Sequence, residues 1–330
     1  MSSHERHRIE IDVRSVAPPG ASTVVCDVHV FRDALADSPL LLCCLPGGGM
    51  SRRYFDLDVD REHGEYSMAR HLAGRGFIVA TIDHLGVGES DRPDDGYALT
   101  PQVVADVNAH VVAELTKRLR EGDAVDDLDP LTALRTVGVG HSAGAKLTVC
   151  QQARHRSHVA LVLLGFGGAG LRDRLTPAEL ALADDPEAID ARLAELTRER
   201  FGEPLPMPRR GSSTFLVGAP MPPPVHEGLL AARSQMLAMV GLSSMIPGSI
   251  RPFSDVVDVP VFVGVGDRDI AGSPHAIPAL FPSSDDVSLF VLADAGHNHN
   301  VAPGRIALWD RVAAWVGLTT ADHATSTRHA

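Results

Sequence analysis

Short apolar runs alternate with longer amphipathic stretches through most of the 330-residue sequence, and this alternation constrains the fold more than any other feature. The apolar runs have the length of strands, and the stretches between them repeat apolar residues at helical spacing. Strands that alternate with helices are typical of a mostly parallel sheet with helices on both faces. The predicted strands are 8–13, 22–31, 40–45, 77–82, 136–140, 159–165, 259–265 and 287–292.

The first two predicted strands differ from the others. Residues 8–13 and 22–31 alternate polar and apolar side chains, as antiparallel edge strands with one solvated face do. Residues 40–45 are continuously apolar, which is typical of a central buried strand. We therefore expect a mostly parallel eight-stranded sheet with two antiparallel strands at one edge. The predicted helices of this core are 65–74, 100–120, 143–154, 274–281 and 305–316.

The alternation fails between residues 167 and 256. Two helical patterns, 185–201 and 225–239, are separated there by a Pro-rich stretch. An interruption of this length is too long for a connecting loop, so it predicts an inserted helical subdomain. The expected organisation is a core formed by 1–166 and 257–318, a helical lid or cap at 167–256, and a flexible tail at 319–330.

The composition argues against several classes of protein. With 44% hydrophobic and 22% charged residues, the chain is typical of a soluble globular protein. Its first residues lack the apolar region of a signal peptide, and no apolar run approaches the roughly 20 residues of a membrane span. We therefore expect a cytoplasmic protein without a membrane partner. The formal net charge of -12 argues against nucleic acid, because phosphate binding requires a basic face.

The stretch T-V-G-V-G-H-S-A-G-A-K, residues 136–146, places G-x-S-x-G between a predicted strand and a predicted helix. Gly140 and Gly144 would let the strand and the helix approach closely around a strained Ser142. A serine hydroxyl is a poor nucleophile by itself, so it needs a base, and the base needs a carboxylate that holds its tautomer. The alternative is that Ser142 is only a small residue in a tight corner.

Two later stretches follow predicted strands and supply these partners. Asp267 and Asp269 come after 259–265, and His297 comes after 287–292. Side chains at the carboxyl ends of strands in an open α/β sheet point into the functional crevice. Either aspartate could orient His297, and Asp267 could equally cap a turn. A metal site made by His297 and His299 would need further ligands that the sequence does not show, so no metal is expected.

The chain order of serine, acid and histidine resembles the α/β-hydrolase fold of the serine-nucleophile, esterase- or lipase-like type, and it differs from chymotrypsin and subtilisin. The resemblance covers about 40–154 and 259–316, and the insert matches the position of the family's lid. In relatives the acid ends a G-x-x-D pattern, which favours Asp269. The family's G-H motif before the last helix points to His297.

The resemblance extends to two loops. D-H-L-G-V-G-E-S, residues 83–90, is similar to a turn of the family and is expected to be structural. P-G-G-G-M-S follows strand 40–45, where relatives provide one donor for the oxyanion, the second coming from the residue after the nucleophile. This implies an oxyanion hole made by Gly48 and Ala143, with Gly49 as the alternative. The loop lacks the G-K-[ST] ending of a phosphate-binding loop.

The substrate pocket is expected to involve Met50, His141, Met236 and Met239. Methionine adapts to irregular apolar shapes, so the methionines of the insert, together with Phe215, suit a bulky hydrophobic acyl or alcohol group. The alternative is that Met236 and Met239 are merely the buried face of a helix. Arg52 and Arg53 are expected to be solvated or salt-bridged rather than substrate anchors.

The predicted function is hydrolysis of a carboxylic ester, lactone or thioester of a hydrophobic small molecule through an acyl-Ser142 intermediate. The same triad would also serve an acyltransferase, a peptidase or a cofactor-free peroxidase-like enzyme. A non-catalytic ligand-binding protein is the alternative from another class. No cofactor is expected. A homodimer is the assembly considered, because dimers are common among soluble enzymes.

Overall fold

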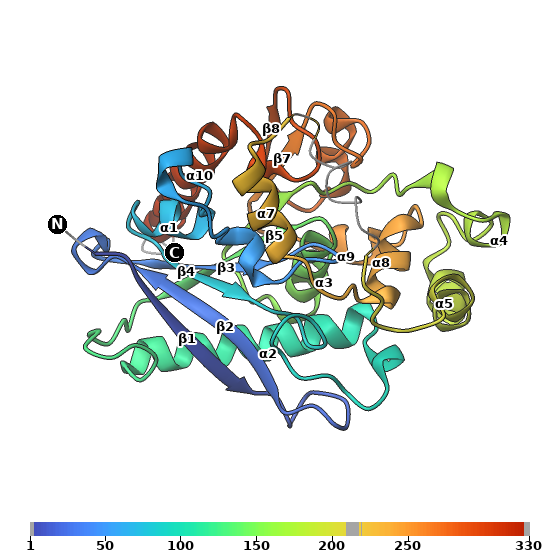
Figure 1. Cartoon of the computed structure of the whole chain (residues 1–330), viewed down its shortest axis with the longest axis horizontal. Coiled ribbons are helices and arrows are strands. Elements are labelled where there is room, and N and C mark those ends of the chain that lie inside the picture. Colours follow the sequence, from blue (N-terminus) through green and yellow to red (C-terminus); the bar gives the residue numbers. More distant parts are fainter. Residues whose placement is uncertain (1–2, 209–217, 219, 327–330) are drawn as a thin grey trace.

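The computed structural model describes residues 3–208, 218 and 220–326. Its strands form a single sheet of eight in the order β1-β2-β4-β3-β5-β6-β7-β8 (Figure 1). The strands are β1 Glu5–Asp12, β2 Thr23–Val30, β3 Leu40–Leu45, β4 Ile78–Ile82, β5 Arg135–His141, β6 Ala160–Leu164, β7 Val261–Gly266 and β8 Val287–Leu292. All pairs from β4 to β8 are parallel, so the predicted α/β sheet is confirmed.

The antiparallel edge is also present, but only β1 has a solvated face. β1 pairs with β2, and β2 pairs with β4, both antiparallel. β2 is buried from Val24 to Val30, so the prediction of one wet face is wrong for this strand. Its polar side chains are covered by protein: Asp27 lies against the buried Arg52, and His29 stacks on His4. The alternation of polar and apolar residues in β2 therefore does not reflect a solvated face. Both faces of the strand are buried, and the polar side chains of one face contact other polar groups of the protein.

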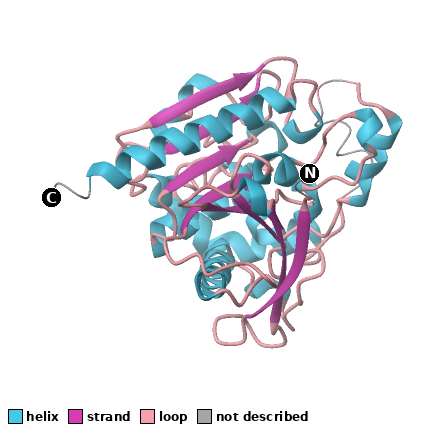
Figure 2. Cartoon of the chain, turned by 90° about the vertical axis from the view of Figure 1, so that its left-hand side faces the viewer, coloured by secondary structure: helices cyan, strands magenta, loops and turns pink. Residues whose placement is uncertain are grey.

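Helices cover both faces of the sheet (Figures 1 and 2). α1 (Met68–Ala73) and α10 (Arg305–Ser326) pack on one face, and α2 (Pro101–Glu121) and α3 (Ala143–His155) pack on the other. Alternate residues of β3 point to opposite faces, as the pleat of a strand requires. The expected helix 274–281 is instead two short 3₁₀ turns, Pro274–Ala276 and Pro278–Leu280, because Pro278 cannot continue a helix begun before it.

The insert between β6 and β7 contains α4 (Pro177–Leu180), α5 (Pro186–Phe201), α7 (Pro223–Ala231), α8 (Ala238–Met245) and α9 (Arg251–Ser254). The prediction of one helix at 225–239 is wrong, because the chain is extended between α7 and α8. The backbone N–H groups of Ser234 and Met236 donate to Gly49 O and Pro206 O, each at 2.9 Å. Hydrogen bonds to distant segments thus replace the helical ones.

The C-terminal helix is longer than the sequence predicted. α10 extends to Ser326 rather than ending near residue 316, so residues 319–326 of the expected tail are helical. Trp309 and Val316 are fully buried against the sheet, and Thr320 O accepts from the Arg135 guanidinium. Residues 327–330 of the expected tail lie outside the described residues. None of the described helices is long and apolar enough to cross a membrane.

Candidate active site

Ser142 alone forms the turn between β5 and α3. Its backbone has φ 54° and ψ -119°, a conformation that costs a residue with a side chain about 1–3 kcal/mol. Glycine is required on both sides of it. A Cβ at Gly140 would lie 2.4 Å from Ala145 Cα, and one at Gly144 would lie 2.1 Å from Leu45 O. The strand, the turn and the helix can approach as they do only because neither position carries a side chain.

The acid and base predicted from the sequence are in contact. His297 Nδ1 lies 2.7 Å from Asp269 Oδ1, and both side chains are buried. Burial alone would raise the pKa of Asp269, but its hydrogen bonds with His297 and His299 hold that pKa well below its usual range. An ionised carboxylate can only accept hydrogen bonds, so in this contact His297 Nδ1 carries the hydrogen. In the neutral ring Nε2 is then free to accept a proton.

The two aspartates after β7 have different contacts. Asp267 accepts hydrogen bonds from the backbone N–H groups of Asp294 and Ala295, each at 3.0 Å. It therefore fixes the loop that leads from β8 to His297. Asp269, the last residue of the G-x-x-D pattern, is the aspartate that contacts the histidine.

His299 is a site residue whose contact the sequence reasoning missed, since it was considered only as a metal ligand. Its Nε2 lies 2.8 Å from Asp269 Oδ2 and 3.1 Å from the backbone nitrogen of Gly266, so each oxygen of the carboxylate has a histidine nitrogen within hydrogen-bond distance. No group of three or more metal-ligating side chains forms within the described part of the chain. The signal in the sequence was a second histidine two positions after His297.

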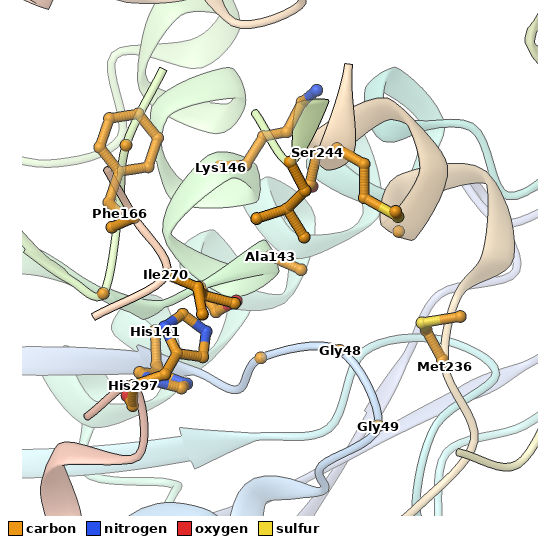
Figure 3. A pocket seen from close by; sticks show the side chains of 18 of the residues that line it. Gly48, Gly49, His141, Ala143, Lys146, Phe166, Met236, Ser244, Ile270 and His297 are labelled. Atoms are coloured by element: carbon orange, nitrogen blue, oxygen red, sulfur yellow. Dashed lines mark hydrogen bonds between the residues drawn. The ribbon is translucent and has the colours of Figure 1, made fainter. Parts of the chain in front are cut away.

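Ser142 and His297 line one cavity of about 240 Å³ at the carboxyl edge of the sheet (Figure 3). The end of β6 lies between them. Ser142 N–H donates to Leu164 O at 2.8 Å. A Cβ on the next residue, Gly165, would lie 3.0 Å from His297 Nδ1. The parallel sheet therefore brings the three residues of the predicted triad to the same edge.

His141 lines this cavity as predicted, and it also supports the base. Its Nε2 lies 2.8 Å from His297 O, and its ring stacks on Tyr54 with the centroids 4.5 Å apart. Burial lowers the pKa of His141 well below its usual value, so the ring is neutral. A neutral ring can donate from Nε2 to the carbonyl and so fix the backbone of His297.

The glycine loop after β3 forms another wall of the cavity. A Cβ at Gly48 would lie 3.9 Å from Ala143 Cβ, so these two residues lie side by side. Ala143 is the first residue of α3, and its N–H has no acceptor within the helix. Gly49 instead packs against Pro208 of the insert. This arrangement favours Gly48 over Gly49 as the partner of Ala143.

The four residues predicted to bind substrate fall into two groups, those that line the cavity and one that does not. Met50, His141 and Met236 line the cavity. Met239 does not, and that prediction is corrected: it is buried in a separate cluster where α8 packs on α5, with Ile189 and Leu193. Phe215 lies outside the described residues. Met245, one of the methionines of the insert, also lines the cavity. Sequence reasoning missed further lining residues from α3, the ends of β6 and β7, and the insert, among them Lys146, Phe166, Ile250 and Ile270.

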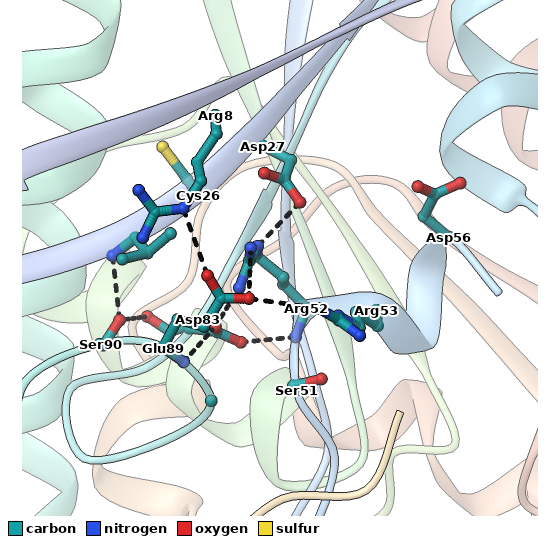
Figure 4. Close-up of polar contacts among 12 residues, drawn as sticks. Arg8, Cys26, Asp27, Ser51, Arg52, Arg53, Asp56, Asp83, Glu89 and Ser90 are labelled. Atoms are coloured by element: carbon teal, nitrogen blue, oxygen red, sulfur yellow. Dashed lines mark hydrogen bonds and ion pairs between the residues drawn. The ribbon is translucent and has the colours of Figure 1, made fainter. Parts of the chain in front are cut away.

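Arg52 is buried in an ionic network beside the glycine loop (Figure 4). Its guanidinium donates to Asp27 at 2.8 Å, Asp83 at 2.6 Å and Glu89 at 3.1 Å. Burial alone would lower the pKa of Arg52, but these carboxylates raise it above its usual value. The expectations of a salt-bridged Arg52 and of a structural turn at 83–90 are both confirmed. The network anchors the end of the glycine loop to β2 and β4.

The model of the alpha/beta hydrolase family matches residues 41–307, so the chain belongs to this family. Comparison with curated proteins gives no match by sequence. Solved structures share the fold at low identity. An esterase from Thermogutta terrifontis is 18% identical, with 95% of this chain and 99% of that chain covered and a TM-score of 0.55. The thioesterase domain from the curacin biosynthetic pathway is 13% identical, with 93% and 99% covered and a TM-score of 0.56.

A third similar structure belongs to an enzyme with a different activity. A variant of haloalkane dehalogenase DbeA from Bradyrhizobium elkanii is 12% identical, with 98% of this chain and 100% of that chain covered and a TM-score of 0.60. Esterase, thioesterase and dehalogenase thus share one fold. The reaction must be argued from the site itself.

Proposed function

We propose that this chain is a serine hydrolase that cleaves a carboxylic ester, lactone or thioester through an acyl-Ser142 intermediate. One observation carries the proposal: a serine in a strained strand-to-helix turn shares a cavity with a histidine that is hydrogen-bonded to a buried, ionised aspartate. The strained turn presents the hydroxyl, and the aspartate fixes the histidine tautomer that can take its proton.

In the proposed reaction Ser142 Oγ attacks the substrate carbonyl while His297 Nε2 takes the hydroxyl proton. Asp269 stabilises the imidazolium that forms, and His297 then returns the proton to the leaving group. The N–H groups of Gly48 and Ala143 bind the negative oxygen, at about 3 kcal/mol for each donor. A water molecule activated by His297 completes the cycle by releasing the acid.

The alternative reactions differ from ester hydrolysis in the nucleophile, in the bond attacked or in the second half-reaction. An elbow serine is unsuited to dehalogenation, since on this fold halide and epoxide chemistry usually employs an aspartate at that position. Acyl transfer, peptidase and cofactor-free peroxidase-like reactions share the acylation by Ser142, and they differ in the bond attacked or in what enters the second half-reaction. Product analysis with competing nucleophiles separates them from hydrolysis.

The first experiment is the Ser142→Ala variant. Loss of the nucleophile is expected to reduce turnover of a p-nitrophenyl ester by about 10³- to 10⁶-fold while the fold is retained. Turnover and circular dichroism are measured together. A fluorophosphonate probe should label the wild type and fail on Ser142→Ala, whereas Ser288→Ala on the edge strand β8 should label normally. Undiminished turnover by Ser142→Ala would overturn the proposal, and failure of the folded wild type to react with the probe would favour a non-catalytic binding protein.

A further inference from the structure

Lys146 is a buried cation in the wall of the candidate active site. It lies one helical turn beyond Ser142 in α3, with its N–H donating to Ser142 O at 3.1 Å. The residue is only 3% exposed, and it lines the same cavity as Ser142 and His297. Figure 3 shows Lys146 well separated from His297, reaching toward the part of the insert that carries Ser244. The proposed reaction makes no use of this ammonium group.

The partners of Lys146 Nζ carry no charge. Nζ donates to Ser243 Oγ and, at 2.8 Å, to Ser249 Oγ. No carboxylate lies within ion-pairing distance of it among the described residues. The undescribed residues 209–217 and 219 contain no Asp or Glu in their sequence. Two acidic groups oppose the lowering of its pKa: Cys150, a buried thiol of α3 whose own pKa burial raises to about 12, and Asp190 of α5, an exposed residue that accepts a hydrogen bond from Gln102.

An uncompensated buried charge is costly, and buried charges in proteins are normally paired. Burial lowers the pKa of Lys146 to about 8, so at neutral pH most molecules still carry the ammonium. Two serine hydroxyls accept two of its three possible hydrogen bonds without neutralising its charge. The chain has only one other lysine, Lys117, which is exposed on α2. A positive charge is therefore maintained on a side chain that lines the cavity, in spite of its cost.

A purely structural role does not account for the charge. Lys146 links α3 to Ser243 of α8 and to Ser249, so it tethers the insert to the core. A neutral side chain could fill this space at lower cost, because Ser249 Oγ already donates to Ser243 O at 2.6 Å. What a neutral side chain could not supply is attraction for an anion that enters the cavity.

We propose that Lys146 Nζ forms a subsite for an anionic group of the substrate, such as a carboxylate at the far end of a hydrophobic chain from the reacting bond. The inference rests on the proposed function for the identity of that bond, and it narrows the substrate from any hydrophobic ester to one that carries an anion. Apart from Arg233, whose guanidinium donates to Pro208 O, the remaining walls are largely apolar. Phe166, Met236, Met245 and Ile270 suit the hydrophobic chain that joins the two ends of the substrate.

The test compares matched esters. On the acyl side, mono-4-nitrophenyl esters of adipic, pimelic and suberic acids are compared with 4-nitrophenyl alkanoates of equal chain length. On the alcohol side, 4-carboxyphenyl hexanoate is compared with phenyl hexanoate. The wild type should favour the carboxylate in at least one arm by about 10- to 100-fold in kcat/KM, the size of one charge-assisted hydrogen bond. The arm that shows the preference locates the anion on the acyl or the alcohol part.

Lys146→Met should abolish this preference, and Lys117→Met should keep it. Lys146→Gln replaces the Met variant if the latter does not fold. Equal loss of kcat/KM for charged and neutral esters in the Lys146 variants would identify a tether only and overturn the proposal. Absence of any preference in the wild type would overturn it as well.

A binding measurement separates this inference from the proposed function. Suberate should raise the Tm of Ser142→Ala, whereas the double variant Ser142→Ala/Lys146→Met should not respond. If suberate raises the Tm in a Lys146-dependent way but the wild type hydrolyses no ester, the anion subsite is supported and the proposed function is wrong. If the wild type hydrolyses esters but Lys146 affects neither the Tm shift with suberate nor the preference for a carboxylate, the proposed function is supported and the anion subsite is wrong.

Discussion

Arg52 and Lys146 are both buried cations, but they differ in what surrounds their charge. The Arg52 side chain is 5% exposed and contacts three carboxylates, from β2, the end of β4 and the following turn. Lys146 is 3% exposed and contacts two hydroxyl groups. One charge belongs to a closed network within the protein, whereas the other belongs to a side chain that lines a cavity and has no carboxylate partner among the described residues.

This difference distinguishes a buried charge that stabilises the fold from a buried charge that we assign to ligand binding. A buried ion pair needs partners for both charges, and the Arg52 network supplies them without any ligand. At Lys146 no carboxylate of the described residues balances the charge, so we infer that the balancing charge comes from outside the chain. The comparison therefore makes opposite predictions for the stability of the unliganded protein when each cation is removed.

The largest effect is expected for Arg52→Met. Removing the guanidinium leaves the buried carboxylates of Asp27 and Asp83 without a counter-charge, which should lower the free energy of unfolding by about 3–5 kcal/mol. Urea unfolding at neutral pH measures this loss. A variant as stable as the wild type would show that Arg52 is not needed to balance the charges of Asp27 and Asp83, and the contrast with Lys146 would be lost.

Lys146→Met is expected to act in the opposite direction. The pKa of this lysine falls from the usual 10.5 to about 8 in the fold, so at neutral pH the buried ammonium destabilises the folded state. Its removal should raise the free energy of unfolding by about 1–3 kcal/mol. Destabilisation in urea at pH 7 would show that the contacts of Nζ outweigh the cost of burying its charge.

The stability gained by Lys146→Met should depend on pH. Because the folded-state pKa of about 8 lies below the unfolded value of 10.5, the unfolded chain binds more protons between these pH values. The stability of the wild type relative to the variant therefore rises with pH across this window. Unfolding measured in parallel at pH 7 and pH 9.5 should show the difference shrinking, and a constant difference would contradict the assignment.

The smallest effect is expected for Arg53→Ala, the neighbour of Arg52 in sequence. Its side chain is 58% exposed and lies 3.4 Å from Glu89. A solvated pair of this kind contributes less than about 0.5–1 kcal/mol. Thermal unfolding should therefore be nearly unchanged, and a large loss would show that the network extends to the surface.

The parts of the site that could be predicted from sequence are those fixed by the ends of strands. Ser142, Asp269 and His297 each follow a strand of the parallel sheet, so chain order and short motifs were sufficient to place them. Met239 was misplaced because the expected helix 225–239 is broken by hydrogen bonds to Gly49 and Pro206, which no local pattern records. Lys146 went unnoticed as a cavity residue because its place depends on how the insert packs over α3.

The extended segment between α7 and α8 has a mechanical consequence. Ser51 N–H donates to Ala232 O at 2.8 Å, Ser51 Oγ donates to the same carbonyl at 3.1 Å, and Ser234 N–H donates to Gly49 O at 2.9 Å. Two main-chain hydrogen bonds and one from a side chain thus connect the insert to the glycine loop. A substrate that displaces this part of the insert would therefore also move the loop that we propose to bind the oxyanion.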